Sequence, residues 1–406
     1  MANVSSSNGL EKRPKLRFPG FDEPWKETTL SALFSKSTQK NADGHITNVI
    51  CNSAKLGLIP QREYFDKDIA NSDNTSGYYI IRQNDFVYNP RKSYDAPYGP
   101  IRSYKYAEDG IVSPLYLCFH AKRKINPMYY EWYFRSSAWH RYIYMSGDSG
   151  ARHDRVSIKD DTFFAMPINL PPEREQSKIA SFLQSLDERI AAQEKLVASL
   201  KKYKRGLLNK VFSNTDEKIY PTVYLSEVAD FLQGLTYSPS DVANAGHLVL
   251  RSSNIQNGTL SFDDCVYVDK SIPESLQVKC ADVIMCVRNG SKSLVGKTAL
   301  IPIDMPKTTW GAFMMIVRSK LNDTYIFHYL NSQMFFSQVF KDTGTATINQ
   351  ITKGILNECR LPLPPVEERK KISKMLSTFD AKIYNAERTL YALMETRKAL
   401  LQQLFI

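Results

Sequence analysis

The chain has 406 residues, which predicts about two or three domains, each able to bury its own hydrophobic core. Hydrophobic residues make up 43% and charged residues 23%, a globular composition that excludes a disordered chain. No stretch of 18 apolar residues occurs, which excludes a membrane-spanning helix. The 53 basic residues outnumber the 42 acidic ones, and the net charge of +11 favours a polyanionic partner.

The beginning of the chain and its cysteines bear on compartment and chemistry. Residues 1–16 are polar and lack the apolar core of a signal peptide, so we expect a flexible leader. The six cysteines form no Cys-x-x-Cys pair, which predicts reduced thiols in a cytoplasmic protein. The segment Gly296-Lys-Thr lacks the earlier glycine of a phosphate-binding loop, because Ser291 stands there. The sequence predicts neither a metal site nor catalytic residues.

Residues 17–169 are rich in turn-forming, aromatic and β-branched residues. Strands are expected at Tyr78–Ile81, Asp85–Tyr88 and Leu115–Phe119. Cations alternate with tyrosines in this segment; Lys and Arg can hold phosphates, whereas Arg and Tyr can also contact bases. The candidate DNA contacts are Arg91, Lys92, Tyr94, Tyr98, Arg102 and Lys105. The alternative interpretation is an ordinary solvated loop.

Residues 170–213 are repeated without a gap at residues 363–406, and 14 of the 44 aligned positions are identical, which indicates a duplication. Each copy begins with Leu-Pro-Pro and acidic residues and then has apolar residues every three or four positions, as in an amphipathic helix of about 60 Å. The alternative is two helices in unrelated cores. The positions expected to line a seam between the helices, or to dock a partner, are Ile179, Leu183, Leu186, Ile190, Leu200, Ile372, Leu376, Phe379, Ile383 and Leu393.

Residues 214–362 form a second globular segment. Strands are expected at Leu248–Leu250, Asp282–Val287, Thr298–Ile303 and Phe313–Val317. The two globular segments also share short similarities: Asn84-Asp-Phe-Val-Tyr resembles Ala281-Asp-Val-Ile-Met, and an arginine follows each. Candidate DNA contacts here, equally compatible with ordinary surface loops, are Arg251, Ser252, Asn254, Arg288, Asn289, Lys292 and Lys297.

These features predict an α+β chain in the order globular, helix, globular, helix. Two similar domains are separated by two long helices, which we expect to pack as an antiparallel coiled-coil-like pair with pseudo-two-fold symmetry. Residues 1–169 carry +5, the two helical regions +4 and +3, and residues 214–362 carry −1. We therefore expect phosphate attraction mainly from the first domain and the helices.

The sequence resembles the specificity (S) subunits of type I restriction–modification systems. The segment Leu16-Arg-Phe-Pro-Gly-Phe21, followed by Trp25 and Leu30, resembles the opening of many members. The motif Leu-Pro-Pro-x-x-Glu-x-x-Lys-Ile, at Leu170 and again at Leu363, resembles the start of the family's conserved helices. The resemblance implies target recognition domains at residues 17–169 and 214–362, a central conserved helix at 170–213 and a C-terminal conserved helix at 363–406.

The resemblance also implies a function in defence against foreign DNA. A non-catalytic subunit would read a bipartite, asymmetric target in double-stranded DNA and direct adenine methylation and ATP-dependent restriction by its partners. Those partners would be two methyltransferase (M) subunits and two motor–nuclease (R) subunits, which would hold S-adenosylmethionine, ATP and magnesium. The paired helices would set the length of the unread spacer. The neutral charge of residues 214–362 departs from what a second DNA-reading domain is expected to carry.

Two other functions stay open from the residues alone. One is a stand-alone DNA-binding protein with two reading domains and no methyltransferase partner. The other is a coiled-coil scaffold that binds only protein, against which the basic and aromatic residues between Arg91 and Lys124 argue.

Overall fold

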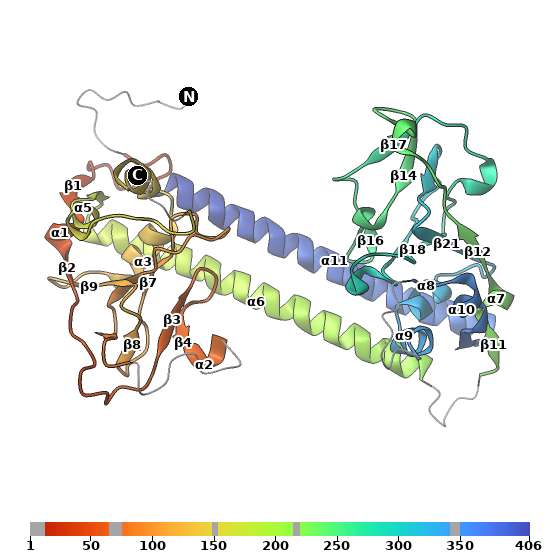
Figure 1. The fold of residues 1–406 in the computed structure, drawn as a ribbon, viewed down its shortest axis with the longest axis horizontal. Coiled ribbons are helices and arrows are strands. Elements are labelled where there is room, and N and C mark those ends of the chain that lie inside the picture. Colours follow the sequence, from red (N-terminus) through yellow and green to blue (C-terminus); the bar gives the residue numbers. More distant parts are fainter. Residues whose placement is uncertain (1–12, 65–74, 148–152, 214–219, 342–349) are drawn as a thin grey trace. The chain divides into compact units, whose positions relative to one another are not determined.

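The computed structural model describes residues 13–64, 75–147, 153–213, 220–341 and 350–406 (Figure 1). The predicted leader therefore lies, for residues 1–12, outside the described residues, whereas the Leu16 amide donates a hydrogen bond to the carbonyl of Gln403. The chain divides into two compact units. The first unit comprises Met1–Ala192 and Thr389–Ile406, and the second unit comprises Gln193–Arg388.

A four-stranded antiparallel sheet organises the first unit. Its strand order is β2 (Phe34–Lys36), β9 (Leu117–Ala121), β6 (Phe86–Tyr88) and β7 (Ile101–Ser103). Strands β5, β6 and β9 confirm the three predicted strands, although β9 begins two residues later than expected, at Leu117. The other elements of this unit are the strand pairs β1 (Lys26–Thr29) with β10 (Pro167–Leu170), β3 (Ile50–Ser53) with β4 (Gly57–Pro60) and β5 (Tyr79–Ile81) with β8 (Gly110–Val112), and helices α1 (Leu30–Leu33), α2 (Gln61–Tyr64), α3 (Pro127–Arg135), α4 (His140–Ser146) and α5 (Asp160–Phe164).

The second unit repeats this sheet. Its strands β12 (Ala229–Gln233), β21 (Met314–Ser319), β18 (Val283–Cys286) and β19 (Thr298–Leu300) are again antiparallel in the same order. The strand predicted over Thr298–Ile303 is wrong beyond Leu300, where Pro302 has no amide to donate to a ladder. The other helices are α7 (Leu225–Val228), α8 (Tyr325–Leu330), α9 (Gln333–Val339), α10 (Lys353–Glu358) and the 3-10 turns Pro239–Asp241, Ser252–Asn254, Glu274–Leu276 and Lys292–Leu294.

The remaining strands of the second unit form a further sheet and two pairs. The further sheet has the order β13 (Val242–Ala243), β17 (Val266–Val268), β14 (His247–Leu250) and β20 (Thr308–Trp310), with β14 and β20 parallel; the described residues of the first unit contain no second four-stranded sheet. The predicted strand Leu248–Leu250 is confirmed within it. The pairs are β11 (Thr222–Tyr224) with β22 (Arg360–Pro362) and β15 (Ile255–Gln256) with β16 (Thr259–Leu260).

The turn before the central strand is built in the same way in both units. Asn84 and Ala281, just before β6 and β18, both have a left-handed backbone, with φ of 72° and 68°. The next residue is an aspartate in each case, and its carboxylate accepts a hydrogen bond from the amide three residues back: Arg82 to Asp85 at 2.9 Å and Lys279 to Asp282 at 2.8 Å. The short similarity seen in the sequence therefore marks a repeated backbone structure.

Two long helices, α6 (Glu173–Phe212) and α11 (Val366–Gln403), take part in both units. Each begins directly after the second proline of Leu-Pro-Pro, whose carbonyl accepts the first helical hydrogen bond. In the first unit Ile179 and Leu183 of α6 share a core with Leu404 and Phe405, which follow α11. In the second unit Leu208 and Phe212 of α6 share a core with Leu376 of α11.

The contacts between α6 and α11 run antiparallel, as predicted. In the second unit Lys201 pairs with Glu387, and Lys204 pairs with Asp380 further back along α11. Every predicted seam position is buried or half-buried: Ile179, Leu183, Ile190 and Leu376 are buried, and Leu186, Leu200, Ile372, Phe379, Ile383 and Leu393 are half-buried. Apolar side chains along one helical face are therefore withdrawn from water, which stabilises the pair.

A half-buried aspartate with two basic neighbours recurs at the offset of 193. In the first unit Asp187 is bound by Arg135, at 3.0 Å, and by Arg397 of α11. In the second unit the corresponding aspartate, Asp380, is bound by Lys204 of α6, which corresponds to Arg397. Asp380 also lies 3.7 Å from His328, which corresponds to Arg135. All three positions of one cluster thus have a counterpart in the other.

Candidate nucleic-acid interface

A groove of about 580 Å³ opens in the first unit among three of its loops. The loops are the β3–β4 turn, the segment after β6 and the segment before β9. Four cations line the groove, namely Lys55, Arg91, Lys92 and Arg155, against the single carboxylate of Asp95. This excess of positive charge makes the groove suitable for phosphate.

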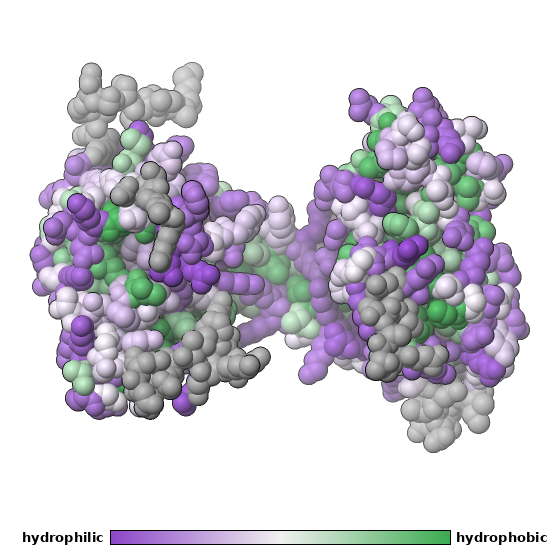
Figure 2. All heavy atoms as spheres, viewed as in Figure 1, coloured by the Kyte–Doolittle hydropathy of each residue, from purple (hydrophilic) through white to green (hydrophobic). Residues whose placement is uncertain are grey.

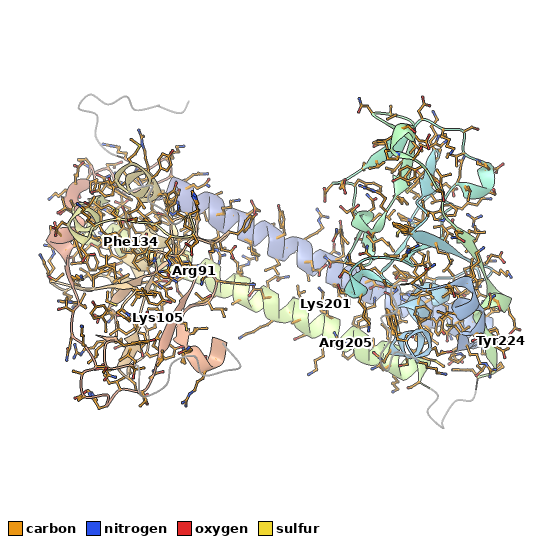
Figure 3. The ribbon with its side chains drawn as sticks, in the orientation of Figure 1. Arg91, Lys105, Phe134, Lys201, Arg205 and Tyr224 are labelled. Atoms are coloured by element: carbon orange, nitrogen blue, oxygen red, sulfur yellow. The ribbon has the colours of Figure 1, made fainter. Side chains whose placement is uncertain are left out.

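The segment that carries Arg91 and Lys92 is fixed by its backbone. The Lys92 amide donates to the carbonyl of Asp154 at 2.8 Å, and the Val156 amide donates to the carbonyl of Pro90 at 2.9 Å. The side chains of Arg91 and Lys92 are exposed, so they can bind a ligand without rearrangement of the main chain. Both predicted residues therefore line the same groove. Figure 3 labels Arg91, and also Lys105, on the first unit.

The other predicted residues of this segment have different surroundings. Tyr94 is fully exposed and Lys105 is exposed. The Tyr98 ring lies 4.8 Å from the His140 ring, and its carbonyl accepts a hydrogen bond from the Tyr88 hydroxyl, so Tyr98 is only half-exposed.

Arg102 is held inside the first unit. Its guanidinium donates to the carbonyl of Ala54 at 2.7 Å and lies 3.8 Å from the Glu131 carboxylate, with the side chain only 16% exposed. Burial lowers the pKa of Arg102 to about 10, partly offset by Glu131. Arg102 therefore holds the β3–β4 turn through these contacts, and its guanidinium is less accessible to phosphate than those of the exposed candidates.

In the second unit, four of the predicted residues lie on two neighbouring loop segments. The side-chain amide of Asn289 donates to the Ser252 hydroxyl at 3.2 Å, which joins the segment after β18 to the 3-10 turn Ser252–Asn254. The exposed Arg288 lies beside Phe313, with its guanidinium carbon 5.4 Å from the ring centroid. Lys292 is exposed two residues beyond Gly290. These groups form a surface able to donate hydrogen bonds to bases or phosphates.

The remaining predicted residues of the second unit serve its own structure. Asn254 is 1% exposed; its side chain accepts from the Arg251 amide and donates to the carbonyls of Ser261 and Asp264. Arg251 forms a salt bridge with Asp264 at 2.8 Å. The Lys297 ammonium donates to the carbonyl of Ile255 at 3.4 Å. Asn254 is therefore a structural residue, and we leave it out of the contact surface.

The helical part of the second unit supplies the positive charge that its loops lack. Between residues 193 and 212 and between residues 366 and 388 there are 12 basic and 5 acidic residues. Lys201, Lys202 and Arg205 are exposed on α6, and Figure 3 shows Lys201 and Arg205 one turn apart. Hydrophilic side chains dominate the visible face of each unit (Figure 2). The neutral second globular segment is thus combined, in its own unit, with a strongly basic pair of helix segments.

Sequence reasoning missed Lys55 and Arg155, which complete the groove of the first unit. Each is far in sequence from Arg91, and no local pattern marks either of them. A second hollow of about 1240 Å³ in the same unit has mixed charges, with Lys26, Arg123 and Lys124 against Glu23, Glu27 and Glu173, and so has no comparable preference for phosphate.

The described part of the chain offers neither a cluster of metal ligands nor a membrane-spanning helix. Among these residues no group of three or more His, Cys, Asp or Glu side chains is placed to hold a metal ion. None of the described helices is both long enough and apolar enough to cross a membrane.

Comparison with known sequences gives matches in both halves of the chain. The family described as "Type I restriction modification DNA specificity domain" matches residues 29–202 and 220–394. The specificity subunit of the type I restriction enzyme EcoKI from Escherichia coli K12 is 29% identical over 166 residues, which cover 39% of this chain and 36% of the relative. The StySPI specificity subunit from Salmonella potsdam is 29% identical over 173 residues, covering 40% and 37%. The chain thus spans little more than a third of the length of these relatives.

Solved structures extend the likeness of fold over nearly the whole chain. A chain from a structure of a type I R-M system, determined to explain complex assembly and conformational transition, has a TM-score of 0.61 at 17% identity and covers 96% of this chain and 99% of its own. The type I S subunit from M. genitalium has a TM-score of 0.59 at 16% identity, covering 97% and 99%. The two matches to the family model together cover most of the sequence, and the chain belongs to the type I restriction modification DNA specificity domain family, with two copies of this domain.

Proposed function

We propose that this chain is the specificity subunit of a type I restriction–modification enzyme, in which each unit reads one half of a bipartite, asymmetric DNA target. The observation that carries the proposal is the duplication: the same sheet occurs twice with the same turn before its central strand, but the loops bear different side chains. Two equivalent supports with unlike loops suit a target whose halves differ in sequence.

The chain itself would supply recognition and assembly. The groove cations of the first unit and the basic helix segments of the second would hold phosphates, and the loop side chains would contact base edges. Two methyltransferase subunits and two motor–nuclease subunits would complete the enzyme and hold S-adenosylmethionine, ATP and magnesium. Helices α6 and α11 would help to dock the methyltransferase subunits and set the spacer.

The direct test is to express the chain with a methyltransferase partner in a host and sequence the methylated DNA. The proposal predicts co-purification of the two chains and one methylated motif made of two specified parts and an unspecified spacer. Methylation of a single continuous motif, or failure of the two chains to assemble, would contradict it and favour a stand-alone DNA-binding protein or a scaffold.

Removing two groove cations should weaken DNA binding in a way that depends on salt. We expect the double variant Arg91→Ala with Lys92→Ala to reduce the slope of log affinity against log salt by about 2, because about two fewer phosphate contacts are made. Fluorescence anisotropy at several salt concentrations measures this slope. The matched control is Lys26→Ala with Arg123→Ala, which removes the same charge from the mixed-charge hollow and should leave the slope unchanged.

Lengthening the helices should change the spacer alone. We expect one helical turn inserted after Leu196, with a matching turn after the corresponding Thr389, to lengthen the spacer by about one to two base pairs, because a turn rises 5.4 Å and a base pair 3.4 Å. Methylome sequencing reads both the spacer and the specified bases. An altered base preference in either half would contradict a role of the helices in spacing.

A further inference from the structure

The arginines that follow the central strands occupy equivalent positions in the two units. The backbone of Arg91 forms an isolated antiparallel β-bridge with Arg155, and that of Arg288 forms one with Gln350. The residue before each arginine accepts the same kind of backbone hydrogen bond, from Val156 to Pro90 at 2.9 Å and from Ile351 to Val287 at 2.7 Å. The main chain therefore presents Arg91 and Arg288 from the same place on the repeated fold.

An exposed apolar residue also occupies equivalent positions in the two units. The strand registers pair Tyr88 with Leu117 and Met285 with Met315, so the residues two positions earlier, Leu115 and Phe313, correspond. Each is 60% exposed, just before the strand β9 or β21 begins. Neither belongs to a hydrophobic cluster of the described residues, so both side chains are open to a ligand.

In each unit the arginine and the apolar residue belong to one surface. The carbonyl of Phe313 accepts hydrogen bonds from the amides of Val287, at 3.0 Å, and Arg288, at 3.2 Å, and the Arg288 guanidinium lies beside the Phe313 ring. In the first unit Leu115 and Arg91 line the same groove. Two loops thus present a cation and an apolar group side by side in the second unit, and the equivalent residues line one groove in the first.

This pairing suits base edges better than phosphates alone. An arginine can donate two hydrogen bonds to guanine O6 and N7, and an apolar side chain can contact the methyl group of thymine. A surface that held only phosphates would gain nothing from Leu115 or Phe313. A protein partner also binds apolar surface, but four cations against one carboxylate around Leu115 favour DNA.

We propose that Leu115 and Phe313, each paired with its arginine, are specificity-determining residues that contact bases at the equivalent step of the two half-sites. The inference rests on the proposed function, since it names side chains within the two DNA-reading surfaces. The difference between leucine and phenylalanine at one structural position gives the two halves of the target different preferences there.

The test is selection of a randomised duplex library by the full chain together with its methyltransferase partner. Phe313→Ala is expected to reduce discrimination by about 5- to 100-fold at one base pair, or two adjacent ones, in one half-site, while the other half-site stays unchanged. Leu115→Ala should do the same in the other half-site. Phe313→Leu keeps an apolar side chain and should retain more discrimination than Phe313→Ala.

Matched controls are Ile303→Ala in the second unit and Met145→Ala on α4 in the first, which remove apolar side chains of 65% and 72% exposure away from the two proposed contact surfaces. An unchanged preference profile for Phe313→Ala, or equal weakening for every duplex, overturns the inference. So does loss of the methyltransferase partner with unaltered preference, which identifies a protein contact instead. If the unsubstituted chain enriches no bipartite motif, the proposed function itself fails, so the two failures are distinct.

Discussion

Exchange of the second globular segment should change one half of the methylated target and leave the other half as it was. The expected change is complete replacement of that half-site, because the side chains that we propose to contact bases lie on loops such as those of Asn289 and Phe313, within the exchanged residues 220–362. The measurement is sequencing of methylated DNA from a host that carries the chimaeric chain with its methyltransferase partner.

The exchange has a structural condition and a control. The segment packs on Leu208 and Phe212 of α6 and Leu376 of α11, so the donor must supply apolar residues that fill the same core. Returning the original segment to the chimaera should restore the original half-site. A change in both halves, or in neither, would contradict reading by two separate units.

Asp187→Asn should destabilise the first unit by about 2 kcal/mol, which is the second large effect that we expect. Burial opposes ionisation of Asp187, but Arg135 and Arg397 outweigh burial and hold its pKa below the ordinary value. A neutral side chain would leave two partly buried guanidiniums without their shared carboxylate. Hydrogen–deuterium exchange with mass spectrometry follows each unit separately and should show faster exchange in peptides of the first unit.

The corresponding variant in the second unit, Asp380→Asn, is the matched control. Burial raises the pKa of Asp380 and Lys204 only partly offsets this, while burial and Lys204 lower the pKa of His328 to about 3. Ionised Asp380 therefore gains little from its neighbours, and we expect a loss below about 1 kcal/mol. An equal or larger loss for Asp380→Asn would contradict this difference between the two clusters.

The same difference gives opposite dependences on pH. The depressed pKa of Asp187 means that its contribution is present above the pKa of an unfolded aspartate and is lost as pH falls through the folded value. The raised pKa of Asp380 gives the reverse sign, with a contribution that is lost as pH rises through its folded value. Exchange measured from pH 7 down to about pH 3 should therefore show acid weakening that Asp187→Asn reduces in the first unit.

The sequence predicted the repeated parts well because they depend on local periodicity. The gap-free repeat, its Leu-Pro-Pro starts and the apolar spacing identified α6 and α11 within three residues of their ends, and the segments at Asn84 and Ala281 marked equivalent turns. The burial of Arg102 and Asn254 could not be predicted, because their partners Ala54, Glu131 and Asp264 are brought near only by the fold of loops.

Leu115 and Phe313 were missed for a different reason. Their apolar character extended the expected strands by one or two residues at the N-terminal end, which assigned them to the interior of a sheet. Only the register of the folded ladder places them outside the strands, on the exposed loops. A residue type that fits a buried strand is ambiguous at the end of that strand.

The core of the first unit has a consequence for how the chain is made. Leu404 and Phe405 are 2% and 4% exposed in that core, and Phe405 lies against Tyr129 and Tyr133. A ribosome adds these residues only after the whole second unit has been synthesised, so the first unit cannot finish folding in the order in which it is translated. A nascent chain that stalls late in translation therefore exposes apolar surface of the first unit, although most of that unit was synthesised first.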